Sequence, residues 1–158
     1  MKITIISVGK IKEKYLIEGI KEYAKRLSRY TVLDMIEIKD EQEPDNLSEK
    51  DLEIIKNIEG KRIIAKLPPS YVISLAIQGK QMDSIALSEL IVEIQNYTSS
   101  NITFVIGGSN GLSDEVLEKS DFLLSFSKMT FPHQLMKLIL LEQVYRAFRI
   151  MNSEPYHK

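Results

Sequence analysis

The sequence contains no cysteine, which excludes disulfides, thiol nucleophiles and cysteine-ligated zinc or iron–sulfur sites. Its two histidines, His133 and His157, are too few for a metal centre built from histidine, so we expect no metal. No apolar run approaches the ~20 residues that span a bilayer, and residues 1–30 show no charged-then-apolar leader ending in small residues. These absences predict a soluble, cytoplasmic protein that does not use a membrane.

The length of 158 residues fits one domain, and no linker or internal repeat interrupts it. Residues 1–158 are therefore expected to form a single domain, with 152–158 as a C-terminal tail. The net charge of −1 hides an uneven distribution: residues 34–59 are strongly acidic, whereas residues 127–158 carry an excess of bases. The two segments are either ordinary solvated faces, or the basic one meets an anionic partner. Charge alone does not decide between these alternatives.

Strand-like and helix-like patterns alternate along the whole chain. Strands are expected at 2–8, 31–38, 71–77 (ending at Gly79), 101–106 and 122–126. Helices are expected at 15–27, from Ser48 towards Lys66, at 84–97, from near Ser113, and from Pro132 to about Met151. Continuously apolar inner strands predict an α/β domain, with a mostly parallel sheet and helices on both faces. Ligands of such sheets bind at the carboxyl ends of the strands, here the loops after Leu75, Ile106 and Phe126.

The glycine-rich segment Gly107–Gly111 follows the fourth expected strand and is open to several interpretations. It matches neither the dinucleotide pattern G-x-G-x-x-G nor a Walker loop. It does satisfy G-x-S-x-G around Ser109, and Asp121 with His133 or His157 follows in the order of a serine hydrolase triad. Against a hydrolase, Asp121 precedes a strand, and only one further strand follows the glycines. The other interpretations are a backbone-lined ligand pocket and a tight turn without a ligand.

Two C-terminal segments carry side chains that are unusual for their positions. Residues 126–134 place two phenylalanines and a methionine in a loop, where they either wall a flat apolar ligand or cover the core. His133 follows in the first turn of the last helix, where the helix dipole disfavours a cation, so we expect a neutral histidine. The tail 154–158 combines stacking, hydrogen-bonding and cationic groups that suit a nucleotide, although a free C-terminus is ordinarily frayed.

Five motifs carry a family resemblance: the start MKITIISVGKIKEKY, the strand LAIQG, the loop FVIGGSNGL, the segment LSFSKMTFPHQLMKLILLEQVYRAF and the ending PYHK. Together they resemble the RlmH family, the small SPOUT-superfamily methyltransferases of the bacterial large ribosomal subunit. The resemblance covers essentially the whole chain. It implies a C-terminal trefoil knot, a rare exception to unknotted topology, and a homodimer with the last helix in the interface. It also implies S-adenosylmethionine as the cofactor, without a metal.

The resemblance further implies which residues form the site. Its cofactor contacts fall on Leu75, Gly107, Phe126, Ser127, Lys128, Met129, Thr130 and Phe131. The implied reaction is methylation of N3 of a pseudouridine in 23S rRNA of assembled ribosomes, with the tail of one protomer completing the site of the other. For the substrate side we hypothesise Arg146, Tyr156, His157 and Lys158. His157 would serve either as the proton acceptor or in a purely positional role.

Two departures from the family pattern matter. The pattern resembles L-D-x-x-G, and its acidic position is Ala76 here, which predicts weaker cofactor binding. The chain ends in Lys158 where several relatives show arginine, which keeps the charge but loses bidentate phosphate geometry. The alternative function is a diverged homologue that binds ribosomes or rRNA without methylating them.

Overall fold

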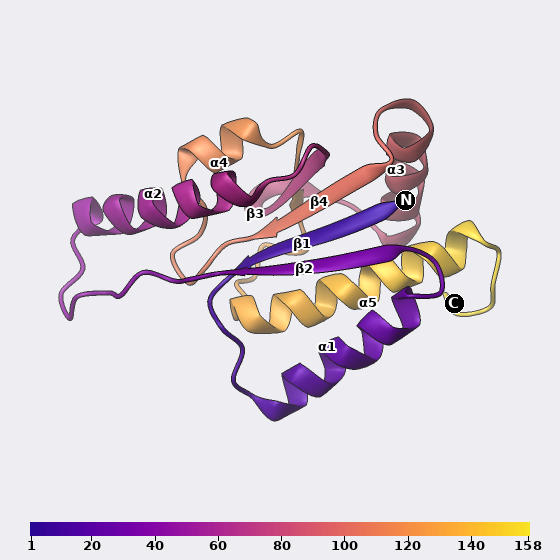
Figure 1. Cartoon of the computed structure of the whole chain (residues 1–158), viewed down its shortest axis with the longest axis horizontal. Helices are drawn as coiled ribbons and strands as arrows, with labels where there is room; N and C mark the ends of the chain where they lie inside the picture. Colours follow the sequence, from indigo (N-terminus) through magenta and orange to yellow (C-terminus); the bar gives the residue numbers. More distant parts are fainter.

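The computed structural model describes all residues from Met1 to Lys158, and its centre is a five-stranded sheet (Figure 1). The strands are β1 (Lys2–Val8), β2 (Val32–Ile38), β3 (Tyr71–Gln81), β4 (Asn101–Ile106) and β5 (Phe122–Ser125). The helices are α1 (Lys14–Leu27), α2 (Glu49–Lys66), α3 (Ser84–Tyr97), α4 (Asp114–Lys119) and α5 (His133–Met151). The order across the sheet is β2-β1-β4-β3-β5 and every pairing is parallel, which confirms the predicted α/β class.

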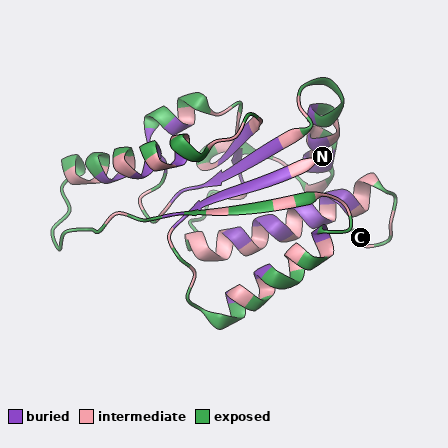
Figure 2. Cartoon of the chain, viewed as in Figure 1, coloured by how far each residue is buried: buried purple, intermediate pink, exposed green.

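Helices cover both faces of the sheet, with α1, α3 and α5 on one side and α2 and α4 on the other (Figure 1). Successive residues of β1 alternate between the two cores: Ile3 and Ile5 pack towards α5, whereas Ile6 and Val8 pack towards α2. Strands β1 and β4 are therefore buried on both faces, while the edge strand β2 is largely exposed (Figure 2). This two-sided burial explains why the inner strands are continuously apolar. None of the helices combines the length and hydropathy needed to cross a bilayer.

Helix α2 begins at the residue that the sequence predicts. The Ser48 side chain accepts the N–H of Asp51 at 3.1 Å, and the Asp51 carboxylate accepts the N–H of Ser48 at 3.1 Å. This reciprocal pair is a capping box, and its hydrogen bonds lower the pKa of the Asp51 carboxyl. The helix ends at Lys66, just before the two prolines at 68 and 69, as expected.

Strand β3 departs from the prediction, because it does not end at Gly79 but continues to Gln81. Leu75 and Lys80 both pair with Leu124, so residues 76–79 bulge out of the ladder between them. A Cβ atom at Gly79 would lie 2.7 Å from the backbone carbonyl of Leu123. The glycine therefore permits a close approach to β5 instead of ending the strand.

Candidate active site

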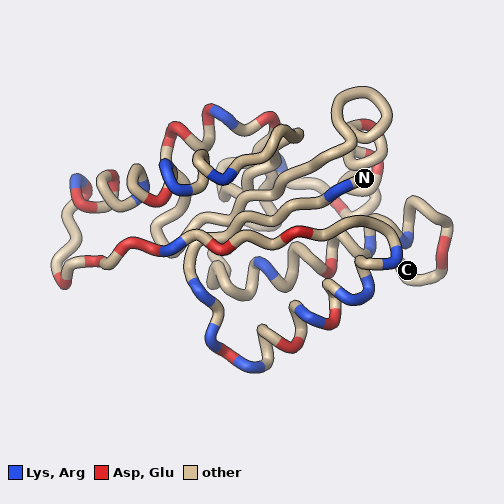
Figure 3. The backbone as a smooth tube through the Cα atoms, in the orientation of Figure 1, with Lys and Arg blue, Asp and Glu red and all other residues tan.

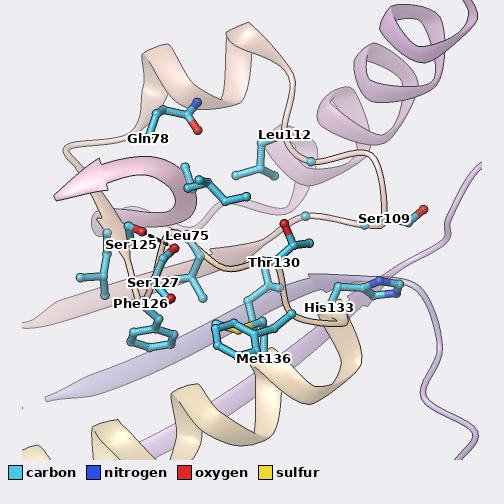
Figure 4. Close-up of a pocket in the computed structure, with 18 of the residues that line it drawn as sticks. Leu75, Gln78, Ser109, Leu112, Ser125, Phe126, Ser127, Thr130, His133 and Met136 are labelled. Atoms are coloured by element: carbon cyan, nitrogen blue, oxygen red, sulfur yellow. Dashed lines mark hydrogen bonds between the residues drawn. The ribbon is translucent and has the colours of Figure 1, made fainter. Parts of the chain in front are cut away.

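A cavity of about 560 Å³ opens where β3, β4 and β5 end, at the edge of the sheet that the sequence predicts (Figure 4). Its walls are the bulge of β3, the glycine loop after β4, the loop after β5 and the first turn of α5. None of the side chains that line it is a carboxylate, an ammonium or a guanidinium group. The cavity therefore offers apolar surface, hydroxyls and main-chain groups, in a volume within the ~300–1,000 Å³ usual for small-molecule sites.

Seven of the eight predicted cofactor contacts line this cavity: Leu75, Gly107, Phe126, Ser127, Met129, Thr130 and Phe131. Lys128 is exposed and is not part of the lining. Sequence reasoning did not single out Gln78 or Met136, which also line it. Gln78 lies directly before Gly79 in the motif LAIQG, so its position there was the available signal. Phe126 and Phe131 thus form a wall of the cavity, and Phe126 also packs against the core, so the two alternatives for this segment are compatible.

Two serines hold the loop after β5 in shape. The buried Ser125 hydroxyl donates to the carbonyl of Ser127 at 3.0 Å, and the Ser127 hydroxyl accepts the N–H of Met129 at 3.0 Å. These local bonds keep the backbone of residues 125–129 folded without any secondary structure of its own. Thr130 then projects into the middle of the cavity (Figure 4).

The glycine loop forms the opposite wall with its backbone. A Cβ atom at Gly107 would lie 2.9 Å from the carbonyl carbon of Gly111, and Gly111 itself has a left-handed φ of +84°. The Gly111 N–H donates to the carbonyl of Gly108 at 3.1 Å, which closes the turn. The segment is both a tight turn and a pocket wall, so these two interpretations are compatible.

The serine hydrolase interpretation is wrong. The Ser109 hydroxyl donates to the carboxylate of Glu43 at 3.0 Å and makes no hydrogen bond with a histidine. The Asp121 carboxylate accepts the N–H of Val72 at 2.8 Å, near the start of β3, whereas Ser109 follows the carboxyl end of β4. Serine and aspartate therefore lie at opposite ends of a parallel sheet, and no triad forms.

His133 lines the cavity from the first turn of α5 (Figure 4). Burial lowers the pKa of its imidazole below the ordinary 6.5, so the ring is neutral at pH 7. This direction agrees with the neutral histidine expected from the helix dipole, although its cause here is burial. The ring extends away from Thr130 and Met136 (Figure 4), and its Nε2 lies beside Gly9, where an added Cβ atom would be 3.4 Å away.

Three of the four predicted substrate residues gather around a carboxylate that the sequence analysis missed, Glu142. One oxygen of Glu142 accepts bonds from Arg146 Nε at 3.0 Å, Arg146 Nη2 at 2.6 Å and the Tyr156 hydroxyl at 3.1 Å. The guanidinium also lies 4.6 Å from the centre of the Tyr156 ring. Burial and the bond to Glu142 raise the pKa of Tyr156, so its phenol stays protonated. The i, i+4 spacing of Glu142 and Arg146 was the available signal, and Lys158 stays exposed outside the cluster.

His157 belongs to the same cluster, and its contact with Arg146 determines which ring nitrogen of the histidine carries the proton. Nδ1 of His157 is 3.2 Å from Nη1 of Arg146. A guanidinium only donates hydrogen bonds, so Nδ1 must accept, and the neutral ring carries its proton on Nε2. The Nε2–H group is thereby left as a donor for another molecule.

The cluster and the cavity are separate within one chain. Arg146 comes 13 residues after His133 on α5, about 20 Å along the helix axis. Arg146, Tyr156 and Lys158 do not line the 560 Å³ cavity. His157 lines a neighbouring cavity of about 420 Å³, which shares Leu124, Phe126 and Phe131 with the first. One chain therefore holds two groups of predicted site residues that meet only along this aromatic wall.

Ion pairs occupy most of the basic side chains of residues 127–158. Arg146 pairs with Glu142, Arg149 pairs with Glu154, and Lys137 is buried 3.9 Å from Glu37. Lys128 and Lys158 remain exposed without an ion-pair partner. The acidic residues after β2 lie at the far end of the molecule from the C-terminus (Figure 3). The charge open to an anionic partner is thus smaller than the sequence suggests.

Comparison with known proteins places the chain among methyltransferases. A family model described as "Predicted SPOUT methyltransferase" matches residues 1–157. The proteins named Ribosomal RNA large subunit methyltransferase H from Bacillus pumilus and Clostridioides difficile are 57% and 58% identical to it, over the full length of both chains. A solved tRNA (m1G37) methyltransferase from Aquifex aeolicus aligns with 100% of this chain and 75% of its own, with a TM-score of 0.56. At 14% identity, that structure shows a shared fold alone.

Proposed function

Since the chain belongs to the SPOUT methyltransferase family, we propose that it methylates large-subunit ribosomal RNA with S-adenosylmethionine as the methyl donor. The target is N3 of a pseudouridine in 23S rRNA, and the working form is a homodimer acting on assembled ribosomes. The observation that carries this proposal is the 560 Å³ cavity, lined by seven of the eight predicted cofactor residues. The names of the two full-length relatives support a ribosomal substrate.

The cavity fits the chemistry of this cofactor. Aromatic and aliphatic side chains suit the adenine ring, and the Ser127 and Thr130 hydroxyls with the glycine-loop backbone can bind polar groups. When bound, S-adenosylmethionine supplies a methyl group on a positively charged sulfur. No cationic side chain lines the cavity to repel that charge, and the phenylalanine faces attract it. Because Ala76 leaves no carboxylate in the lining, we expect binding to be weaker than in relatives that keep an acid there.

In the proposed reaction, Arg146 and His157 bind the target base and stabilise its charge. A bond from N3 to the methyl carbon forms as the carbon–sulfur bond breaks, and the N3 proton leaves. The Arg146 guanidinium favours the anionic form of the base. With Nδ1 held by Arg146, His157 binds the base through Nε2–H, and the proton passes to water. His157 takes the proton itself only if its contact with Arg146 opens, so the geometry favours the positional role.

A second copy of the chain would bring the two groups together. In a homodimer with α5 in the interface, the tail of one protomer lies over the cavity of the other, and residues 152–158 become a functional part of the domain 1–158. Three apolar side chains beside the cavity, those of Ile77, Met129 and Phe131, are 56%, 73% and 36% exposed. Exposed apolar surface of this kind supports the proposal that the partner's tail packs there. The trefoil knot implied by the family belongs to the same proposal.

The decisive experiment measures transfer of a labelled methyl group from S-adenosylmethionine to ribosomes that lack the modification. We expect label in a single pseudouridine of 23S rRNA, identified after digestion to nucleosides, and little label in free rRNA. Truncation after Pro155 should abolish transfer and leave the Kd for the cofactor within about twofold, because all the predicted cofactor contacts lie between Leu75 and Phe131. Equal loss of both would contradict the composite site. Ribosome binding without label would favour the non-catalytic alternative.

Two variants of His157 separate its possible roles in that assay. Glutamine places an amide donor near the position of Nε2 but cannot take up a proton. A positional role therefore predicts that His157→Gln keeps transfer within about tenfold of wild type, the worth of one hydrogen bond. A general base predicts a loss of ~10²–10⁴-fold. His157→Phe, which lacks both functions, should transfer less than His157→Gln if the role is positional, and about as little as His157→Gln if His157 is a general base.

A further inference from the structure

Beyond α5 the tail folds back against the body of the protein, and we propose that Tyr30, Arg149 and Glu154 form a latch that positions Tyr156, His157 and Lys158 for methyl transfer. The inference rests on the proposed function of the tail and adds residues outside both groups described above. Tyr30 comes from the turn between α1 and β2, far from the tail in sequence. These are positioning residues, because they act through the tail and touch neither the cofactor cavity nor the Glu142 cluster.

The latch joins three parts of the chain at the carboxylate of Glu154. The Tyr30 hydroxyl donates to Glu154 Oε2 at 2.7 Å, and Arg149 Nη1 donates to the same oxygen. Arg149 Nη1 also lies 3.1 Å from the Tyr30 hydroxyl, and Arg149 Nη2 donates to the carbonyl of Pro155 at 3.0 Å. The residue directly before Tyr156 is therefore held by its main chain.

The backbone between α5 and the latch reverses direction sharply. Ser153 has a left-handed φ of +54°, which is uncommon for a residue other than glycine. The N–H of Ser153 donates to the carbonyl of Ile150 at 3.0 Å, and the N–H of Glu154 donates to that of Arg149 at 2.9 Å. A residue other than glycine adopts this conformation at an energetic cost, so contacts further along the chain must hold it. The latch supplies them.

Packing keeps the latch in place, so the hydroxyl of Tyr30 can be removed without displacing the ring. The Tyr30 ring stacks on Phe148 with ring centres 5.8 Å apart, so the ring stays fixed when its hydroxyl is removed. The Arg149 and Glu154 side chains are only 19% and 34% exposed, and an ion pair shielded from water is worth more than one at the surface. The Tyr156 ring then meets Tyr145 edge-on at 5.0 Å. The latch thus fixes the position of Pro155, from which Tyr156, His157 and Lys158 extend.

The test compares Tyr30→Phe and Glu154→Gln with wild type in two assays. We expect carboxypeptidase to release the last residues roughly tenfold faster from both variants, as the loss of one charge-assisted hydrogen bond would allow. Methyl transfer to ribosomes should fall by a similar factor, whereas the Kd for S-adenosylmethionine should stay within about twofold. Tyr15→Phe is the matched control, because Tyr15 is 69% exposed and lies in the first turn of α1, at the opposite end of that helix from Tyr30.

Each other outcome has a distinct meaning. Unchanged digestion and unchanged transfer in both variants would overturn the latch. Equal losses of cofactor affinity and transfer would also overturn it, because they would indicate a general effect on the fold. If wild type itself transfers no methyl group, the proposed function fails, while carboxypeptidase digestion still tests the latch independently.

Discussion

Glu59 is a buried carboxylate directly beneath the glycine loop of the cavity. Its side chain is 5% exposed, Oε2 accepts the N–H of Glu41 at 3.0 Å, and Oε1 has no hydrogen-bond partner. A Cβ atom at Gly108 would lie 3.3 Å from Oε1. Burial raises the pKa of Glu59 above its ordinary 4.5, and the neighbouring charge of Asp40 adds to the effect, whereas Arg62 opposes it. The folded protein therefore favours the protonated form of this acid.

This shift makes stability depend on pH in a defined direction. The folded state binds more protons than the unfolded state between the two pKa values, so ionising Glu59 lowers the free energy of unfolding as pH rises. Glu59→Gln keeps the acceptor for Glu41 and removes the charge. We therefore expect the free energy of unfolding of Glu59→Gln, relative to wild type, to be higher at pH 7.5 than at pH 4, measured by guanidinium unfolding. The exposed Glu118→Gln serves as control, and the same difference at both pH values would contradict the prediction.

At the residue scale, the motifs named seven residues that line one cavity, but not the residues that support it. Most of these seven residues follow the end of β4 or β5, so their position in the sequence indicates their place in the fold. Glu59, Glu142 and Tyr30 matter because of partners that the fold brings to them. Glu142 had a visible i, i+4 partner in Arg146, but nothing local indicated that the phenol of Tyr156 would return to it.

At the element scale, residues close in sequence determine the two ends of α2, whereas a distant partner strand determines the path of β3. The capping box at Ser48 and the prolines after Lys66 act within a few residues, so the sequence predicts the helix correctly. The continuation of β3 to Gln81 depends on its pairing with β5, which follows later in the chain. A glycine in a strand pattern marks either an end or a close approach, and only the partner strand distinguishes them.

Gly79→Ala should strongly destabilise the protein. The new methyl group would collide with the Leu123 backbone at 2.7 Å, and neither β3 nor β5 can move without breaking the ladder. We expect a loss of roughly 2–3 kcal/mol in the free energy of unfolding. Gly111→Ala is the comparison, because a Cβ atom at Gly111 would meet no atom within 4 Å. The left-handed φ of Gly111 is then the only source of strain, and it costs about 1 kcal/mol. Equal losses in both variants would show that a small shift of the backbone relieves the collision with Leu123, and would contradict the prediction.

At the scale of the whole molecule, the separation of the cavity from the Arg146 cluster makes subunit mixing informative. Thr130→Trp should fill the cavity and block cofactor binding, because Thr130 projects into it from an exposed loop. A chain truncated after Pro155 keeps its cavity but lacks the tail. Each variant alone should be inactive, since no site in either dimer has both parts.

Mixing the two variants with subunit exchange should restore activity. Half of the dimers are then mixed, and each mixed dimer has one site with an intact cavity and an intact tail. The expected rate is about a quarter of wild type, in the labelled-methyl assay with ribosomes. A mixture that stays inactive, although mixed dimers are detected, would place the tail and the cavity of one chain in the same site.

The sequence by itself determined the α/β class, the positions of the ten elements to within a few residues and the edge of the sheet that carries the cavity. These features follow from local causes, namely hydrophobic periodicity, capping residues, prolines and the rule that parallel strands end together. Only the tertiary structure decided that Ser109 and Asp121 lie apart, that β3 passes Gly79, that most C-terminal bases are paired, and that Tyr30 holds Glu154. Each of these depends on which distant side chains the packed layers bring into contact, and no spacing along the chain encodes that directly.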